Sequence, residues 1–100
     1  MDPGKPDICI SDVVEATAGR DIGKLFYCIG VEDDYLLLVN GKDRTLEKPK
    51  RKKRKHARKV LRSETRVAEK LRSGDKVLNS ELRRDLAYLS RELQSNTLGG

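Results

Sequence analysis

Residues Val13–Asn40 read VVEATAGRDIGKLFYCIGVEDDYLLLVN, and this stretch decides the fold. Its runs of β-branched and aromatic residues, bounded by turn residues, predict three short strands at Val13–Ala16, Lys24–Val31 and Tyr35–Asn40. The pair Asn40-Gly41, which follows the third run, is typical of a type I′ hairpin turn. We therefore expect the middle of the chain to form a meander of small antiparallel strands.

The second and third of these runs, LFYCIGV and YLLLV, do not alternate between apolar and polar residues. A strand with one face in water should alternate with a period of two, so both faces of these strands need cover. Leu82, Leu86, Leu89 and Leu93 recur at spacings of four, three and four, which places them on one side of a helix. We expect this stripe to pack on the sheet, because it is too short to favour a coiled coil with a second chain.

Two helices are predicted in the last third of the chain. Ser63 is the candidate N-cap of the first helix, and Gly74 can end it. Asn79 or Ser80 can cap the second helix, which is expected to run to about Gln94.

A basic run follows the predicted strands. Lys48–Lys59 reads KPKRKKRKHARK and contains nine Lys or Arg residues and no acid. The run contributes +9 to a net charge of +6, so the other 88 residues sum to −3. Charge this concentrated indicates a contact with a polyanion, and nucleic acid is favoured over a solvated tail. Lysine and arginine contacts to phosphates supply affinity that depends on salt, but they do not distinguish one base sequence from another.

A series of short motifs runs through the chain. In chain order, the motifs are Val13-Val14, Ala18-Gly19-Arg20-Asp21-x-Gly23-Lys24, Asp34-Tyr35-Leu36, Asn40-Gly41-Lys42, Lys48-Pro49-Lys50 and Lys55-His56. The first two, followed by an apolar strand, resemble the KOW motif of ribosomal proteins and transcription elongation factors. As a whole the series is similar to the archaeal and eukaryotic large-subunit ribosomal family "L fourteen e" and to its short bacterial relatives, the KOW-domain RNA-binding proteins.

The resemblance implies a mainly β fold, a small SH3-like (KOW) barrel with a C-terminal extension of two short helices. A fourth strand is expected at Lys42–Leu46. The chain departs from the family at Arg54 and Ala57, where relatives have apolar residues around Lys-His, so we expect the basic run to be mobile in the free protein. The expected parts are a flexible arm at 1–7, the barrel at 8–62 including the basic segment 48–59, the helical extension at 63–94 and a frayed tail at 95–100.

By resemblance, the protein is expected to be a non-enzymatic RNA-binding protein, ribosomal or ribosome-associated. It would be cytoplasmic, monomeric when free, and docked on folded ribosomal RNA of the large subunit. The low aromatic content favours recognition of RNA shape over base stacking. The turns near residues 19–24 and 40–44 are expected to share one surface with the basic run. The candidate RNA-binding residues are Arg20, Lys24, Lys42, Arg44, Lys48, Lys50, Arg51, Lys52, Lys53, Arg54, Lys55, His56, Arg58 and Lys59.

Other function classes find less support. Cys9 and Cys28 have no second Cys or His at ligand spacing, so we expect buried reduced thiols, no metal and no cofactor. The segment Gly19–Gly23 precedes a strand and is no dinucleotide fingerprint. A membrane segment and a signal peptide are not expected. One alternative stays open: a KOW module that binds a transcription or translation factor through the leucine stripe or the acidic tip Glu32–Asp34.

Overall fold

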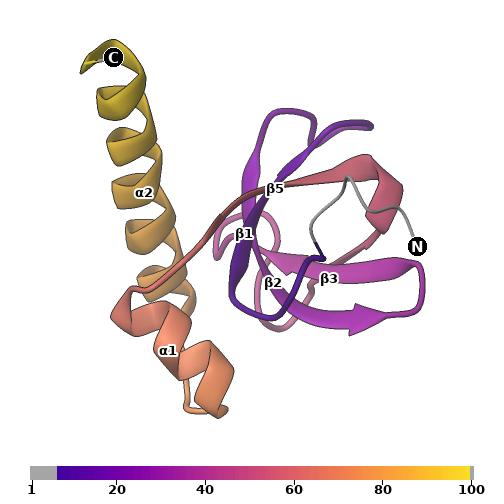
Figure 1. Cartoon of the computed structure of the whole chain (residues 1–100). Coiled ribbons are helices and arrows are strands. Elements are labelled where there is room, and N and C mark those ends of the chain that lie inside the picture. Colours follow the sequence, from indigo (N-terminus) through magenta and orange to yellow (C-terminus); the bar gives the residue numbers. More distant parts are fainter. Residues whose placement is uncertain (1–6, 100) are drawn as a thin grey trace.

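The computed structural model describes residues 7–99, with side chains described as far as residue 95, so most of the expected arm at 1–7 lies outside the described residues. The domain is β-rich, with five antiparallel strands in one sheet and two C-terminal helices (Figure 1). The order of the strands across the sheet is β4-β3-β2-β1-β5. The elements are β1 (Asp12–Ala16), β2 (Leu25–Glu32), β3 (Tyr35–Val39), β4 (Lys50–Lys53), the 3₁₀ turn η1 (Arg54–His56), β5 (Ala57–Arg62), α1 (Arg66–Ser73) and α2 (Asn79–Gly99).

The first three predicted strands are present, each within one residue of the expected bounds. The fourth strand expected at Lys42–Leu46 was wrong, because the carboxamide of Asn40 folds that segment into a turn. Its oxygen accepts hydrogen bonds from the backbone N–H groups of Lys42 and Arg44, at 3.0 Å each. The two-residue hairpin expected at Asn40-Gly41 is therefore replaced by a wider turn, and the fourth strand forms later, as β4.

Both faces of the sheet are covered, as the sequence predicted. The inner face carries one core, made of Ile8, Val14, Ala16, Phe26, Cys28, Leu36 and Leu38. The outer face carries a second core, in which strand residues pack against both helices. Its members are Val13, Tyr27, Val39, Val67, Ala68, Val77, Leu82, Leu86 and Leu89. Figure 1 shows α1 and α2 along one side of the sheet, and Leu82, Leu86 and Leu89 of the leucine stripe supply the predicted cover.

Much of the basic run forms strands, whereas the expected mobility in the free protein stays a prediction. Residues of β4 pair with β3, and residues of β5 pair with β1. The short turn η1 joins β4 to β5, the two edge strands of the sheet. Backbone pairing therefore involves residues along more than half of the run.

The two helices differ from the prediction at their ends. Thr65, and not Ser63, caps α1, because the Thr65 side chain accepts a hydrogen bond from the N–H of Ala68 at 3.2 Å. Gly74 ends α1 in the left-handed region, as predicted. Helix α2 begins at Asn79 and extends to Gly99, so the expected tail belongs to the helix up to that residue. Both cysteines are free thiols, and Cys9 is exposed rather than buried.

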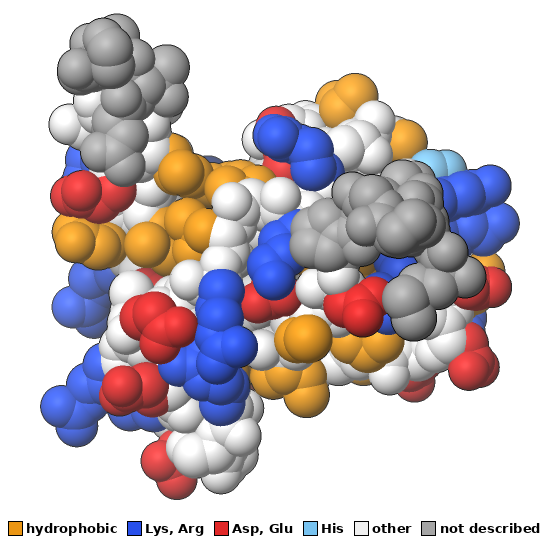
Figure 2. Space-filling view, viewed as in Figure 1, with side chains coloured by type: hydrophobic (Ala, Val, Ile, Leu, Met, Phe, Trp, Pro, Cys, Tyr) orange, Lys and Arg blue, Asp and Glu red, His pale blue; other side chains and the backbone are white. Residues whose placement is uncertain are grey.

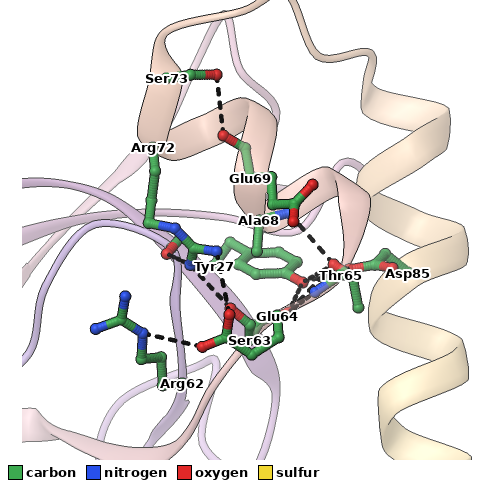
Figure 3. Close-up of polar contacts among 11 residues, drawn as sticks. Tyr27, Arg62, Ser63, Glu64, Thr65, Ala68, Glu69, Arg72, Ser73 and Asp85 are labelled. Atoms are coloured by element: carbon green, nitrogen blue, oxygen red, sulfur yellow. Dashed lines mark hydrogen bonds and ion pairs between the residues drawn. The ribbon is translucent and has the colours of Figure 1, made fainter.

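A buried polar cluster fastens the helices to the sheet (Figure 3). The side chain of Tyr27 on β2 is fully buried, and its hydroxyl lies 2.8 Å from that of Ser63. The Tyr27 hydroxyl donates a short hydrogen bond to the Asp85 carboxylate on α2. Thr65 donates to the same Asp85 oxygen at 2.8 Å. Ser63 is therefore used by Tyr27 rather than as a helix cap.

Tyr27 should make stability depend on alkaline pH. Burial, together with the hydrogen bond to Asp85, raises the pKa of Tyr27 from 10.0 to about 12. The folded state keeps the phenol protonated where the unfolded chain ionises, so stability is full below pH 10 and is lost as the pH rises towards 12. We expect a loss of about 2–3 kcal/mol across that interval. Urea unfolding from pH 9 to 12 should show it, and Tyr27→Phe should remove this part of the pH dependence; equal curves for both proteins would contradict the assignment.

Gly41 is expected to be intolerant of a side chain for steric reasons. Its φ is +77°, and a Cβ there would overlap the carbonyl oxygen of Asn79 at the start of α2. Gly74 has nearly the same φ, +79°, with open space where a methyl group would lie. Gly74→Ala should therefore cost only the left-handed strain, about 1–2 kcal/mol, and Gly41→Ala clearly more. Thermal unfolding of both variants measures the two losses of stability. Equal losses would mean that the start of α2 shifts at little cost to make room for the methyl group.

Candidate nucleic-acid interface

The basic run forms β4 and the start of β5, the two edge strands of the sheet. In Figure 2, Lys and Arg side chains gather beside His56, the single histidine, on the side of the domain away from α2. Side chains alternate along β4, where Arg51 and Lys53 are exposed and Lys52 is buried. The run is therefore a strand edge with two faces and not a uniformly solvated tail.

Five of the nine cations in the run already have partners within the domain. These contacts use the charges to hold segments that are distant in sequence, so the five residues have structural roles. Arg51 lies 3.4 Å from Glu32 and stacks 3.9 Å above the Tyr35 ring. The other four pairs are Lys52 Nζ with the Ala18 carbonyl at 2.8 Å, Arg54 with Asp7 at 4.0 Å, Arg58 with Glu15, and Lys59 with Asp12 at 3.2 Å.

The remaining four cations of the run have no ion-pair or hydrogen-bond partner among the described side chains. Within residues 7–95, Lys48, Lys50, Lys53 and Lys55 form no ion pair and no side-chain hydrogen bond. We call these four residues the free lysines. Three of the four are exposed and Lys50 is half-buried. The free lysines are thus the part of the run whose charge is available to an anion.

The two turns expected to join the basic run also divide into paired and free cations. Arg44 donates from Nε at 3.2 Å and from a terminal nitrogen at 2.9 Å to the buried carboxylate of Asp21. Lys24 pairs with Asp43 at 2.7 Å, and hydrogen bonds from Lys24 and Asn40 lower the pKa of Asp43 to about 2. The same contact raises the pKa of Lys24. Both residues therefore fasten the turns together.

Arg20 and Lys42 are the free cations of these turns. Both are exposed, and within the described part of the chain neither side chain forms an ion pair or a hydrogen bond. They resemble the free lysines in this respect. Together the six residues are the candidate anion contacts that the domain leaves unneutralised.

Contacts join the loop between β1 and β2 to the basic run. The Thr17 N–H donates to the carbonyl of His56 at 2.9 Å, and Lys52 reaches the carbonyl of Ala18. On its other side, the loop is held to the 40–44 turn through Asp21 and Arg44. These hydrogen bonds link both turns to the basic run; that their free cations share one binding surface stays a prediction.

Several residues that shape this surface were missed in the sequence. Glu15, Glu32 and Asp12 neutralise cations of the run from 19 to 47 positions away, and no local spacing marks them. Arg83 on α2 donates to the carbonyl of Gly41 at 2.6 Å and so braces the 40–44 turn. These contacts arise from strand pairing and helix docking, which pair residues that are far apart in the chain.

The acidic tip Glu32–Asp34 lies beside the basic run. The Asp34 carbonyl accepts the N–H of Arg54 at 2.7 Å, and the Glu32 side chain pairs with Arg51. Asp33 has a positive φ of 50°, consistent with its place in the tight turn between β2 and β3. The tip is therefore partly engaged within the domain.

No protein-family model matches the chain, and no curated protein is similar enough in sequence to count as a match. Within residues 7–99, no helix is long and apolar enough to cross a membrane. His56 is half-buried, and over the same residues no cluster of His, Cys, Asp or Glu could hold a metal ion.

Asp21 should be needed to fix the loop that carries Arg20. Asp21→Asn keeps the shape of the side chain but removes the charge that Arg44 and Lys24 contact. A charge-assisted contact of this kind contributes about 1.5–3 kcal/mol. We expect faster amide hydrogen exchange at residues 18–24 in the variant, with the β2–β3 amides unchanged. Asp33→Asn, at an exposed carboxylate, is the matched control; identical exchange in all three proteins would show that the ion pair does not hold the loop.

Proposed function

We propose that this protein is a non-enzymatic RNA-binding protein that docks folded RNA through its edge strands and two adjacent turns. The observation that carries the proposal is the set of six cations without an ion pair among the described residues, the free lysines with Arg20 and Lys42, in segments that hydrogen bonds link to one another. The other cations of the run and of the two turns each have a partner in the described part of the domain, so these six are the cations most available to phosphates. Cations held on an ordered strand edge need little ordering when they bind, which favours affinity.

The fold we propose is an SH3-like barrel of the KOW type. Two features support it. The strand order β4-β3-β2-β1-β5 is a meander whose last strand returns to the first, and the three residues of η1 join the two edge strands. The resemblance of the Val13–Lys24 segment to the KOW motif then suggests that the loop between β1 and β2 faces the RNA.

Recognition of RNA shape fits the aromatic residues better than stacking of bases. Phe26 and Tyr27 are fully buried, and the ring of Tyr35 is covered by Arg51. Tyr88 is exposed, but it lies on α2 and away from the basic run. Without an aromatic platform on the charged surface, phosphates and 2′-hydroxyls are the available contacts. By resemblance to its family, we propose ribosomal RNA of the large subunit, a cytoplasmic location and a monomeric free state.

The alternative is a module that binds a transcription or translation factor. It is less favoured because fewer of the groups that it would use are exposed and unpaired. The leucine stripe that it would use is buried against the sheet at Leu82, Leu86 and Leu89. The acidic tip that it would also use has two of its residues engaged with Arg51 and Arg54. Binding of a protein there would not depend on the free lysines, which separates the two hypotheses experimentally.

A salt series tests the RNA proposal. If all six free cations meet phosphates, log affinity against log salt should have a slope of roughly −4 to −5. Changing the four free lysines to Gln should make the slope shallower by about 3. The matched control changes four cations of the helical extension to Gln, which removes the same charge elsewhere. These four form no ion pair within residues 7–95, and they are Arg66, Lys76, Arg84 and Arg91. Fluorescence anisotropy with a folded ribosomal RNA fragment is the measurement.

The control proteins decide what each result means. Equal losses in both variants, or equal affinity for duplex DNA of the same length, would reduce the function to generic polyanion binding. Salt-insensitive binding, or none, would overturn the RNA proposal and favour a protein partner.

A further inference from the structure

A shallow groove of about 490 Å³ lies between α2, the 40–44 turn and the start of β2. Figure 2 shows a hollow between α2 and the body of the domain, with hydrophobic side chains on its walls. Leu25, Leu86 and Ala87 form the apolar part of the lining. The groove is large enough for one small organic group, since ligand sites commonly measure about 300–1,000 Å³.

The rim of the groove is positively charged. Lys24, Lys42 and Arg83 line it together with a single acid, Asp43, so its formal charge sums to +2. Lys24 is committed to Asp43, whose lowered pKa keeps that carboxylate ionised. Lys42 has no ion pair in the described chain, and one nitrogen of Arg83 is bonded to Gly41, which leaves its other donors available. Two cations are thus free to meet an anionic group.

We propose that this groove holds one unpaired nucleotide of the bound RNA. The base would lie against Leu25, Leu86 and Ala87, and its phosphate would meet Lys42 and Arg83. A nucleotide joins a flat, weakly polar ring to a single anionic group, which matches an apolar floor beside a cationic rim. The hydroxyl of Ser90 also lines the groove and can bond the edge of the base.

The position of the groove favours RNA over an acidic peptide. Lys42 belongs both to the groove and to the set of six free cations, so an RNA on the proposed surface passes its mouth. The loop that carries Arg20 ends at Gly23 and Lys24, which also line the groove. The inference rests on the proposed function and deepens it. The free lysines supply affinity for any folded RNA, and the groove adds preference for RNA with an unpaired base.

Two matched hairpin RNAs test this, one fully paired and one with a single bulged nucleotide. We expect the protein to prefer the bulged hairpin about five- to tenfold, at the lower end of what stacking one base contributes because no aromatic ring lines the groove. Ala87→Trp fills the groove without changing its charge and should abolish this preference while leaving the affinity for the paired hairpin unchanged. Tyr88→Trp, at the next residue of α2 and outside the groove, should keep the preference.

Equal affinity of the unaltered protein for both hairpins would overturn the groove and leave RNA binding intact, and a preference that survives Ala87→Trp would do the same. Loss of binding to both hairpins would instead overturn the proposed function. An NMR titration of the unaltered protein with nucleoside 5′-monophosphates avoids any risk of misfolding. Amide shifts at Leu25, Ala87 and Ser90 are expected, whereas shifts there with an acidic peptide but with no nucleotide would assign the groove to a protein partner.

Discussion

Strands β2 and β3 are apolar on both faces, and this constraint determines how the rest of the chain is used. Neither face can meet water, so one is closed by the inner core and the other by α1 and α2. Tyr27 lies between the sheet and the helices. Because the helices bury its hydroxyl, that group needs a hydrogen-bond partner within the protein. Asp85 and Ser63 provide that contact from α2 and from the segment before α1. Once the helices occupy the outer face, neither face of β2 and β3 remains open to a partner.

Neutralisation of some of its cations supports the strand structure of the basic run. Adjacent cations repel one another, and like charges in a strand lower its stability. The domain offsets this repulsion with carboxylates from β1 and β2, chiefly Asp12, Glu15 and Glu32. Lys52 is held differently, because its ammonium group donates a hydrogen bond to the carbonyl of Ala18. About half of the charge is therefore used to hold the strands together, which is why composition alone overstates the charge on offer to an RNA.

The sequence was informative where a pattern is local. The runs that became β1–β3 and the leucine stripe of α2 have the periods of their elements, so both were predicted correctly. Prediction from the sequence failed where contacts between residues far apart in the chain determine the structure. Lys50–Lys53 has the composition of a tail, yet it forms a strand because β3 offers an edge with which to pair. Ser63 is a good cap by residue type, but it bonds Tyr27, 36 positions away, and Thr65 takes the cap instead.

The 40–44 turn links the proposed phosphate surface to the proposed nucleotide groove. Three contacts hold it in place. Gly41 lies against the start of α2, and Arg83 donates a hydrogen bond to the carbonyl of Gly41. Arg44 donates hydrogen bonds to Asp21 in the neighbouring loop. Lys42 projects from this fixed turn and is shared by both sites. The distance between the groove and an RNA phosphate bound by the free lysines would therefore be fixed by this turn. Binding without sequence preference and selection of an unpaired base would then depend on the same few contacts.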